Sequence, residues 1–319
     1  MNGNEIPCDN SGQDAECRIG ISWPSPRFKR KENIVRDLLT DLTWTQNANP
    51  NEFPLSWDEA FKQIKAWNNE AFHGYTDWRL PNRRELRSLM SYQAQKPSLP
   101  KKHPFSNIFL NWYWTSTSAA INPAYAWYIH LEGARMFYGK KDQYCLVWPV
   151  RGKGNGLLPQ SGQKKCYDKY GYEMTCQNSS QDGEYRLGKN WPEPRFKANG
   201  NIAKDRLTGL NWSINADITE EPVEWEQALE TIKRLNDKKW EGINNWRLPN
   251  INELESLVDC STHSPALPVN NLFRNVRDGY WSSTTSYFEL DWAWVLYMVK
   301  GACGVGYKPG KTFFVWPVH

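Results

Sequence analysis

The sequence lacks any long apolar run. A helix needs about 20 consecutive apolar residues to cross a bilayer, and no stretch of the 319 residues approaches that length. The start, Met1 to Glu5, also lacks the basic, apolar and small-residue regions of a signal peptide. We therefore expect no membrane span, and either a cytosolic protein or an exported one whose signal is missing from this chain.

The sequence also has little excess charge. Its 39 basic and 35 acidic residues leave a net charge of +4, which is far below that of a dedicated nucleic-acid binder. We therefore expect no nucleic-acid partner. Any electrostatic function must come from local patches of charge.

Histidine is scarce, and the sequence has no cluster of cysteine and histidine residues. None of the five histidines stands in a motif for nucleophilic catalysis. The paired Cys and His clusters that a zinc site needs are missing too. We therefore expect no catalytic residue, no metal site and no cofactor.

Aromatic residues, in contrast, are abundant. The chain has 18 Trp, 15 Tyr and 12 Phe, and each such side chain buries a large area in a rigid shape. The composition is therefore that of a globular chain rather than a disordered one. A length of 319 residues suits two domains of ordinary size.

An internal repeat supports two domains. Trp78–Asn82 recurs as Trp246–Asn250, an offset of 168 residues, and Val147–Val150 recurs at the same offset as Val315–Val318. A period this long is a whole domain rather than a solenoid unit. The Gly-rich stretch at residues 152–156 resembles a linker, so we place the two domains at residues 1–152 and 153–319.

The offset also indicates that the first repeat is truncated at its start, because the counterpart of Cys166 would lie before residue 1. We expect Cys166 and Cys176 to form a local disulfide, although two free thiols remain the alternative. Cys8 would then pair with Cys17. Cys260 and Cys303 could join within repeat 2, which leaves Cys145 odd.

Each repeat shows the pattern of an α+β fold, with two helices packed on a small antiparallel sheet. A capping box at Ser56 opens an amphipathic helix, and Asn82 with Glu85 caps a second, shorter helix. Aromatic and β-branched runs then predict strands. These strands cover residues 113–116, 125–131 and 145–150 in repeat 1, and residues 280–283, 292–299 and 312–318 in repeat 2.

Several motifs in a fixed order resemble the Lcl C-terminal domain family. They are Gly-Gln-Asp near the start, Pro-Arg-Phe, Leu-Thr-Gly-Leu-x-Trp (residues 207–212), Trp-Arg-Leu-Pro-Asn, Trp-Ser-Ser-Thr (residues 281–284) and Val-Trp-Pro-Val. The resemblance covers nearly the whole chain twice. Two positions depart from it: Asp41 stands where repeat 2 has Gly209, and the final Val-Arg of repeat 1 is Val-His in repeat 2.

The resemblance implies a secreted or surface-exposed bacterial protein, some of whose relatives bind host glycans, in particular sulfated glycosaminoglycans. It also implies a fold similar to C-type lectins and to formylglycine-generating enzymes. In such domains the segment before the last strand is a variable binding face. The calcium motif of sugar-binding lectins is absent, so we expect no calcium-dependent sugar chelation.

Positions that both repeats share fit the interior best. Five tryptophan pairs recur in identical context, and we interpret them as core rather than as sugar-stacking platforms. The pairs are Trp44/Trp212, Trp78/Trp246, Trp114/Trp281, Trp127/Trp294 and Trp148/Trp316. Arg79 and Arg247 each stand before a helix start, where a held guanidinium needs a carboxylate such as Glu85 or Glu253.

Positions that differ between the repeats are the candidate binding residues. Lysine and arginine meet sulfate groups while tyrosine rings stack on sugar faces, but the same residues also suit an ordinary solvated loop. The candidates are Tyr128, His130, Arg135, Tyr138, Lys140 and Lys141 in repeat 1, and Tyr297, Lys300, Tyr307, Lys308 and Lys311 in repeat 2.

These observations together predict an extracellular, cell-surface or periplasmic recognition or adhesion module. Its partner would be an anionic or sulfated glycan, or a neighbouring surface protein. One alternative is a structural subunit of a surface appendage or filament, in which the chain forms a homo-oligomer. An enzyme similar to the formylglycine-generating enzymes is a further alternative, but the late cysteines, Cys145 and Cys303, do not coincide between repeats.

Overall fold

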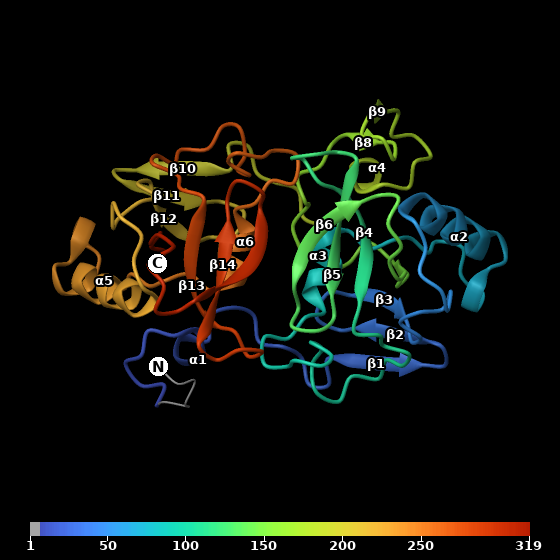
Figure 1. Cartoon of the computed structure of the whole chain (residues 1–319), viewed down its shortest axis with the longest axis horizontal. Coiled ribbons are helices and arrows are strands. Elements are labelled where there is room, and N and C mark those ends of the chain that lie inside the picture. The colour runs from blue at the N-terminus through green and yellow to red at the C-terminus, as the bar shows by residue number, and fades with distance from the viewer. Residues whose placement is uncertain (1–6) are drawn as a thin grey trace. The chain divides into compact units, whose positions relative to one another are not determined.

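Each repeat builds the same order of elements: three short strands, two helices and then a second three-stranded sheet. The structure is a computed structural model that describes residues 7–319. In repeat 1 the elements are β1 (Phe28–Lys31), β2 (Ile34–Asp37), β3 (Leu42–Thr45), α2 (Trp57–Asn69), η1 (Phe72–Gly74), α3 (Arg83–Ser88), β4 (Trp112–Ser118), β5 (Tyr125–His130), β6 (Met136–Lys140) and β7 (Val150–Arg151). Figure 1 labels all of these except η1 and β7.

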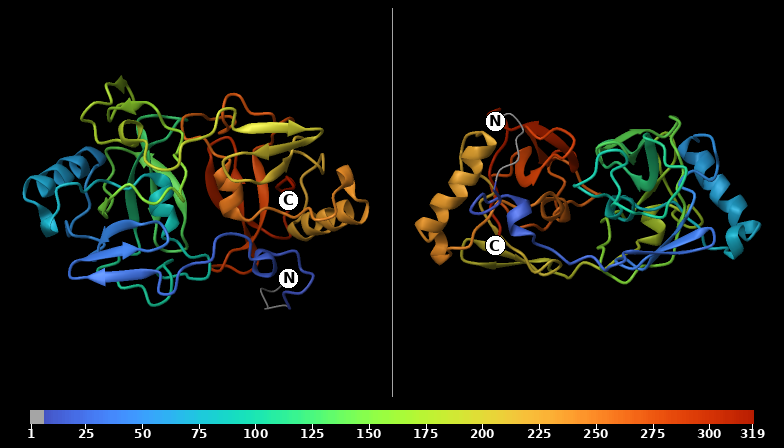
Figure 2. Two further views of the ribbon diagram at one scale, coloured as in Figure 1. Left: turned by 180° about the vertical axis from the view of Figure 1, so that it is seen from behind. Right: turned by 90° about the horizontal axis from the view of Figure 1, so that it is seen from below.

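Repeat 2 repeats this order with small differences in length. Its elements are β10 (Phe196–Asn199), β11 (Ile202–Asp205), β12 (Asn211–Ser213), α5 (Trp225–Asp237), η2 (Trp240–Gly242), α6 (Ile251–Ser256), β13 (Gly279–Thr285), β14 (Trp292–Tyr297) and β15 (Ala302–Tyr307). Helices α2 and α5 each lie to one side of their repeat, and Figure 2 shows both from two further directions. The predicted α+β class is therefore confirmed.

Every named strand pair is antiparallel. The first sheet of repeat 1 has the order β1-β2-β3-β7 and the second has the order β4-β5-β6. Repeat 2 has the orders β10-β11-β12 and β13-β14-β15. The predicted last strand of each repeat is mostly wrong. Residues 145–150 contribute only bridges and the short β7, and residues 312–318 contribute only isolated bridges, because Pro149 and Pro317 cannot donate to a ladder.

Capping explains where the helices start. In α3, Glu85 N donates to Asn82 Oδ1 over 3.0 Å while Asn82 N donates to Glu85 Oε2 over 2.8 Å. Ser56 and Glu59 form the equivalent capping box of α2. Both boxes satisfy backbone N–H groups that a helix leaves without a partner. The two helix starts in repeat 1 are therefore where the sequence predicted them.

The shared tryptophans form the interior, as predicted. Trp44, Trp114 and Trp148 are fully buried, as are Trp212 and Trp281 of repeat 2. The helix tryptophans are buried too, and their indole N–H groups are satisfied: Trp57 Nε1 donates to Thr115 O, and Trp225 Nε1 donates to Ser282 O. Buried indoles need such partners. Each repeat therefore has its own aromatic core between its long helix and its second sheet.

The chain divides into two compact units whose limits differ from the boundary predicted between residues 152 and 153. One unit contains residues 21–190, and the other contains residues 7–20 together with residues 191–319. We call residues 21–157 body 1 and residues 191–319 body 2. Residues 7–20 are leading segment 1, and residues 158–190 are leading segment 2. Each body is thus grouped with the leading segment of the other repeat.

Leading segment 1 contains α1 (Asp14–Cys17), and leading segment 2 contains β8 (Cys166–Tyr167), β9 (Glu173–Met174) and α4 (Asp182–Tyr185). Buried hydrogen bonds explain the grouping. Thr117 Oγ1 in body 1 donates to Asp182 Oδ2 over 2.6 Å, and Thr284 Oγ1 in body 2 donates to Asp14 Oδ2 over 2.9 Å. The boundary was predicted from the sequence repeat, whereas these contacts join each body to the leading segment of the other repeat.

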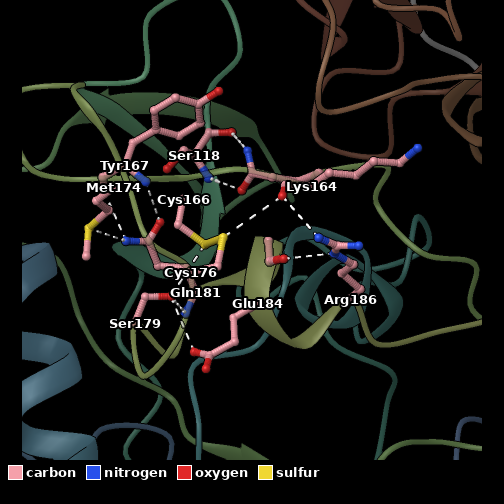
Figure 3. Close-up of a disulfide and its surroundings, with 12 residues drawn as sticks. Ser118, Lys164, Cys166, Tyr167, Met174, Cys176, Ser179, Gln181, Glu184 and Arg186 are labelled. Carbon is pink, nitrogen blue, oxygen red and sulfur yellow. Dashed lines mark hydrogen bonds between the residues drawn. A yellow bond between two sulfur atoms is a disulfide. The ribbon is translucent and has the colours of Figure 1, made fainter.

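One predicted disulfide is formed. Cys166 and Cys176 are joined in leading segment 2, beside Gln181, whose side chain donates to Tyr167 O (Figure 3). Cys8 and Cys17 carry free thiols instead of pairing with each other. The reason lies in the repeat: Cys8 corresponds to Cys176, but Cys17 corresponds to Tyr185 at the end of α4, a position away from the disulfide.

The predicted disulfide between Cys260 and Cys303 is not formed. Both residues are buried among apolar side chains, where a reduced cysteine packs as a small hydrophobic residue. Cys145 is buried as well, and burial raises the pKa of its thiol to about 12. None of the helices in residues 7–319 combines the length and apolar character of a membrane span.

Candidate binding surface

The Trp-Arg-Leu-Pro-Asn motif has a structural role in both repeats. Arg79 Nη1 and Nη2 donate to the two carboxylate oxygens of Glu85 over 2.6 and 2.7 Å, and the pair is buried. Arg247 and Glu253 repeat the arrangement over 2.5 and 2.6 Å. A two-pronged ion pair of this kind fixes both the strand end and the helix start. The prediction that these arginines pair with Glu85 and Glu253 is confirmed.

A second buried ion pair was missed by the sequence analysis. Arg27 donates to both carboxylate oxygens of Asp37 over 3.0 and 2.8 Å, and also to Ser88 O at the end of α3. Arg195 and Asp205 form the same pair in repeat 2. The recurring Pro-Arg-Phe motif was the available signal. It ties the first sheet of each repeat to the short helix.

The predicted binding residues of repeat 1 divide between the interior and the surface. Tyr128, His130 and Lys141 are buried, which does not suit a role on an exposed ligand-binding surface. Arg135 and Lys140 are exposed, and Tyr138 is half-buried. Burial along β6 does not alternate strictly, since Met136 and Gly139 are buried while Phe137 and Lys140 are exposed. Which residues face solvent therefore cannot be assigned from the sequence.

Tyr128 is buried because it fills a space that another residue fills in repeat 2. Its ring packs against Gly139, where an added Cβ would collide with the ring. In repeat 2 the position equivalent to Tyr128 is Val295, and Phe313 takes the place of Cys145. Phe313 packs against Gly306, the equivalent of Gly139. The ring therefore comes from different positions in the two cores, and the space is filled in both.

His130 lies at the end of β5, and its ring packs edge-on against Trp112 with the ring centroids 4.8 Å apart. Its Nδ1 accepts a hydrogen bond from Glu132 N over 3.1 Å. Burial lowers the pKa of His130, and the positive charge of Arg135 lowers it further. The imidazole therefore holds the turn between β5 and β6 rather than facing a ligand.

Lys141 and Lys308 occupy equivalent buried positions over the helix tryptophans. Lys141 Nζ lies 3.9 Å from the Trp57 ring centroid and donates to Tyr167 O and Asp168 O. Lys308 Nζ lies 4.3 Å from the Trp225 ring centroid and donates to Leu290 O. Burial lowers the pKa of Lys141 to about 7 and that of Lys308 to about 8. Both lysines pack into the core, so neither Lys141 nor Lys308 is part of an exposed surface.

The remaining candidates lie on two edge strands. We define the β6 surface as Arg135, Phe137, Tyr138 and Lys140, together with Tyr144 in the following loop. Phe137 is 41% exposed and Tyr144 is 68% exposed, and the sequence analysis missed both. Phe137 stacks on Tyr138 with ring centroids 4.7 Å apart.

The β15 surface is its counterpart in repeat 2. We define it as Val305 and Tyr307 on β15 together with Lys311 in the loop after it. Tyr307 is 48% exposed and Lys311 is exposed. Tyr297 and Lys300 are half-buried at the other end of the β14–β15 hairpin, so they lie away from Lys311 along the strand. The structure therefore does not bring all five predicted residues of repeat 2 together.

Glu132 balances part of the charge of the β6 surface. Its carboxylate lies 3.7 Å from Arg135 and 2.9 Å from Lys96, and the partner side chains are largely exposed. Exposed ion pairs of this kind contribute little stability, so Arg135 can exchange Glu132 for an anionic ligand. Among residues 7–319, no three His, Cys, Asp or Glu side chains are grouped as a metal site would require.

Comparison with protein families gives one match, found twice. The Lcl C-terminal domain model matches residues 33–151 and residues 201–319, which is more than half of the chain. The two matches cover the bodies from β2 and β11 onward and leave out both leading segments. No curated protein and no solved structure matches the chain. The chain therefore belongs to the Lcl C-terminal domain family and carries two copies of that domain in tandem.

Proposed function

We propose that this chain is an extracellular bacterial recognition module that binds anionic, sulfated glycans through the β6 surface and the β15 surface. The proposal assigns binding and no reaction to the chain. It extends the family membership, which is consistent with a surface-associated module. A C-type-lectin-like identity for the fold is part of the same proposal.

The observation that carries the proposal is a contrast between the two edge strands. Two buried positions in or just after these strands are identical in the two repeats: Gly139 matches Gly306, and Lys141 matches Lys308. Their outward positions differ, since Lys140 corresponds to Tyr307 and Phe137 corresponds to Gly304. A shared interior with unlike outer residues is what two copies with separate ligand specificities require.

The chemistry of the outward residues suits a sulfated sugar. The β6 surface combines the cations of Arg135 and Lys140 with the exposed rings of Phe137 and Tyr144. A guanidinium or ammonium group can pair with sulfate, and a ring can cover the apolar face of a sugar. The β15 surface offers Tyr307 with Lys311. Each exposed contact is weak, so two sites on one chain would increase the binding of a polymeric ligand.

The Cys166–Cys176 disulfide supports the proposed location, because disulfides persist in oxidising compartments outside the cytosol.

An immobilised sulfated polysaccharide and the same polysaccharide after desulfation test the proposal. We expect wild-type protein to bind the sulfated form, to lose binding as salt increases, and to bind the desulfated form much more weakly. Arg135→Ala combined with Lys140→Ala should weaken binding, and Lys29→Ala on β1 is the control for loss of an exposed charge. Equal binding to both forms would rule out sulfate recognition.

A further inference from the structure

Each leading segment is a small folded unit with its own hydrogen bonds. Glu16 accepts hydrogen bonds from Asn10 N over 2.6 Å and from Gly12 N over 2.7 Å. Glu184 does the same with Asn178 N and Ser180 N over 2.7 and 2.6 Å. These hydrogen bonds all lie within the segment and favour its folded shape. A pre-shaped segment loses less conformational entropy when it docks.

The two segments dock at equivalent positions on the two bodies. Asp182 accepts from Thr117 Oγ1, and Asn82 Nδ2 donates to Leu187 O over 3.4 Å. In the same way, Asp14 accepts from Thr284 Oγ1, and Asn250 Nδ2 donates to Ile19 O over 3.4 Å. The paired residues of the two repeats lie 168 positions apart, except for Thr117 and Thr284, which lie 167 positions apart. Each body therefore has one docking site, and that site recognises one kind of segment.

The connectivity of the chain is what makes this docking exchangeable. Leading segment 1 is joined directly to body 1 at Gly20–Ile21, yet it is grouped with body 2. The hydrogen bond from Thr284 to Asp14 spans 270 residues of sequence. Docking of leading segment 1 is therefore a binding event between distant parts of one chain. A second copy of the chain presents the same segment and the same site.

Leading segment 1 is held less firmly than leading segment 2. Asp182 and Gly183 of α4 are buried, whereas α1 has no buried residue. An added Cβ on Gly171 of leading segment 2 would come within 2.7 Å of Ala124 N in body 1, which shows how closely the two backbones approach each other. Leading segment 2 is also closed by the Cys166–Cys176 disulfide, whereas Cys8 is a free thiol. The weaker of the two dockings is thus the one with body 2.

We infer that leading segment 1 is an exchangeable plug that docks either on body 2 of its own chain or on body 2 of a second copy. A pair of copies that swap plugs forms a closed dimer, and an unpaired swap continues into a chain of copies. Docking within one chain competes at an effective concentration of about millimolar. Exchange therefore becomes visible when docking within the chain is blocked. This inference does not depend on the proposed glycan binding.

A pair of complementary variants tests the inference. Asp14→Lys removes the plug but keeps the docking site, and Thr284→Val removes the hydroxyl donor of the site but keeps the plug. Neither variant can complete docking by itself. When the two are mixed, the plug of the Thr284→Val chain fits the intact site of the Asp14→Lys chain. Light scattering coupled to size-exclusion chromatography should then show a 1:1 complex with twice the mass of one chain.

Asp9→Lys is the matched control, because Asp9 is an exposed residue of the same segment and the charge change is the same. This variant keeps a working plug and its own site, so it should stay a monomer when mixed with Thr284→Val. An equal amount of complex with Asp9→Lys would overturn the inference. Two separate monomers in the Asp14→Lys mixture would overturn it too.

A second measurement keeps the test valid if Thr284→Val is unstable. The Cys17 thiol of leading segment 1 is half-buried, so release of the plug should increase its rate of reaction with a thiol reagent. In a Cys8→Ser background, we expect Asp14→Lys to raise this rate several-fold relative to Asp9→Lys. Wild-type protein refolded at high concentration should contain dimers that refolding at low concentration does not give. Unchanged Cys17 reactivity and an absence of concentration dependence would contradict the inference.

Discussion

The carboxylate of Asp182 accepts a 2.6 Å hydrogen bond from the hydroxyl of Thr117, although the two residues belong to different repeats. Asp182 is fully buried in this arrangement, beside the ion pair of Arg79 and Glu85. A buried polar contact thus joins body 1, which comes from the first repeat, to leading segment 2, which comes from the second repeat. Such a contact is costly to leave incomplete.

The pH dependence of stability should reveal this buried carboxylate. Burial raises the pKa of Asp182 to about 6, and hydrogen bonds from Thr117 and Ser161 only partly oppose the effect. Between pH 4 and 6 the folded state then binds more protons than the unfolded state. The contribution of Asp182 to the free energy of unfolding therefore falls as pH rises through this window. Urea unfolding of wild-type protein at pH 5 and pH 7 measures the change.

Asp182→Asn is the comparison for that measurement, because the amide oxygen can still accept from Thr117 but the side chain does not titrate. We expect the difference in unfolding free energy between wild type and variant to favour wild type more at pH 5 than at pH 7. A difference that stays constant with pH would show that Asp182 does not titrate in this range.

Loss of the disulfide should loosen leading segment 2. The bond closes a short loop with a sequence separation of 10 residues, and removing a loop constraint of this size costs about 2–3 kcal/mol. Cys176→Ser should therefore lower the urea midpoint of the unit that contains residues 21–190. Cys8→Ser changes the corresponding, unbridged position and should leave the midpoint where it is. Equal effects of the two substitutions would contradict this prediction.

The core of repeat 2 should accept the aromatic ring at the position used in repeat 1 only when Phe313 and Val295 are both replaced. Phe313→Cys leaves an empty space beside Gly306 and should destabilise repeat 2 by about 3 kcal/mol. Adding Val295→Tyr restores the combination found in repeat 1, where Tyr128 and Cys145 fill the same space. A double-mutant cycle measured by urea unfolding should show that the second change recovers more than 1 kcal/mol. If the effects of Phe313→Cys and Val295→Tyr on stability simply add, this explanation of the paired residues is contradicted.

The neighbours Lys140 and Lys141 should respond in opposite ways to truncation. Lys141→Ala removes a buried stem from Trp57 and should cost about 2 kcal/mol of stability. Lys141→Met keeps the packing and removes the buried charge, so it should cost less than Lys141→Ala. Lys140→Ala should change stability by less than about 0.5 kcal/mol, since Lys140 is exposed. Thermal unfolding of the three variants gives these differences.

The sequence was informative wherever a residue had a local partner or a repeated counterpart. Arg79 and Glu85 are six residues apart, and a capping pattern joins them to one helix start. The tryptophan pairs recur in identical context, as core residues do. Cys166 and Cys176 are close enough in sequence for a local bridge. The interior, both helix starts and one disulfide could therefore be predicted from the sequence.

The binding residues were predicted less well because the sequence does not show which side chains face solvent and which face the core. Tyr and Lys are residue types that are common on surfaces, and only the three-dimensional packing shows that Tyr128 and Lys141 are buried. The exchange of leading segments gave no sequence signal at all. Both segments and both docking sites carry the same residue types, so each segment would fit its own body equally well. Only the three-dimensional contacts distinguish these arrangements.

Titration calorimetry with a sulfated polysaccharide tests the central claim most directly, using Lys140→Ala and Lys141→Met in the same protein. Our account predicts that Lys140→Ala weakens binding about fivefold, which corresponds to about 1 kcal/mol. It predicts that Lys141→Met binds like wild type, because Lys141 faces the core. Binding that is lost in Lys141→Met but unchanged in Lys140→Ala would contradict the account.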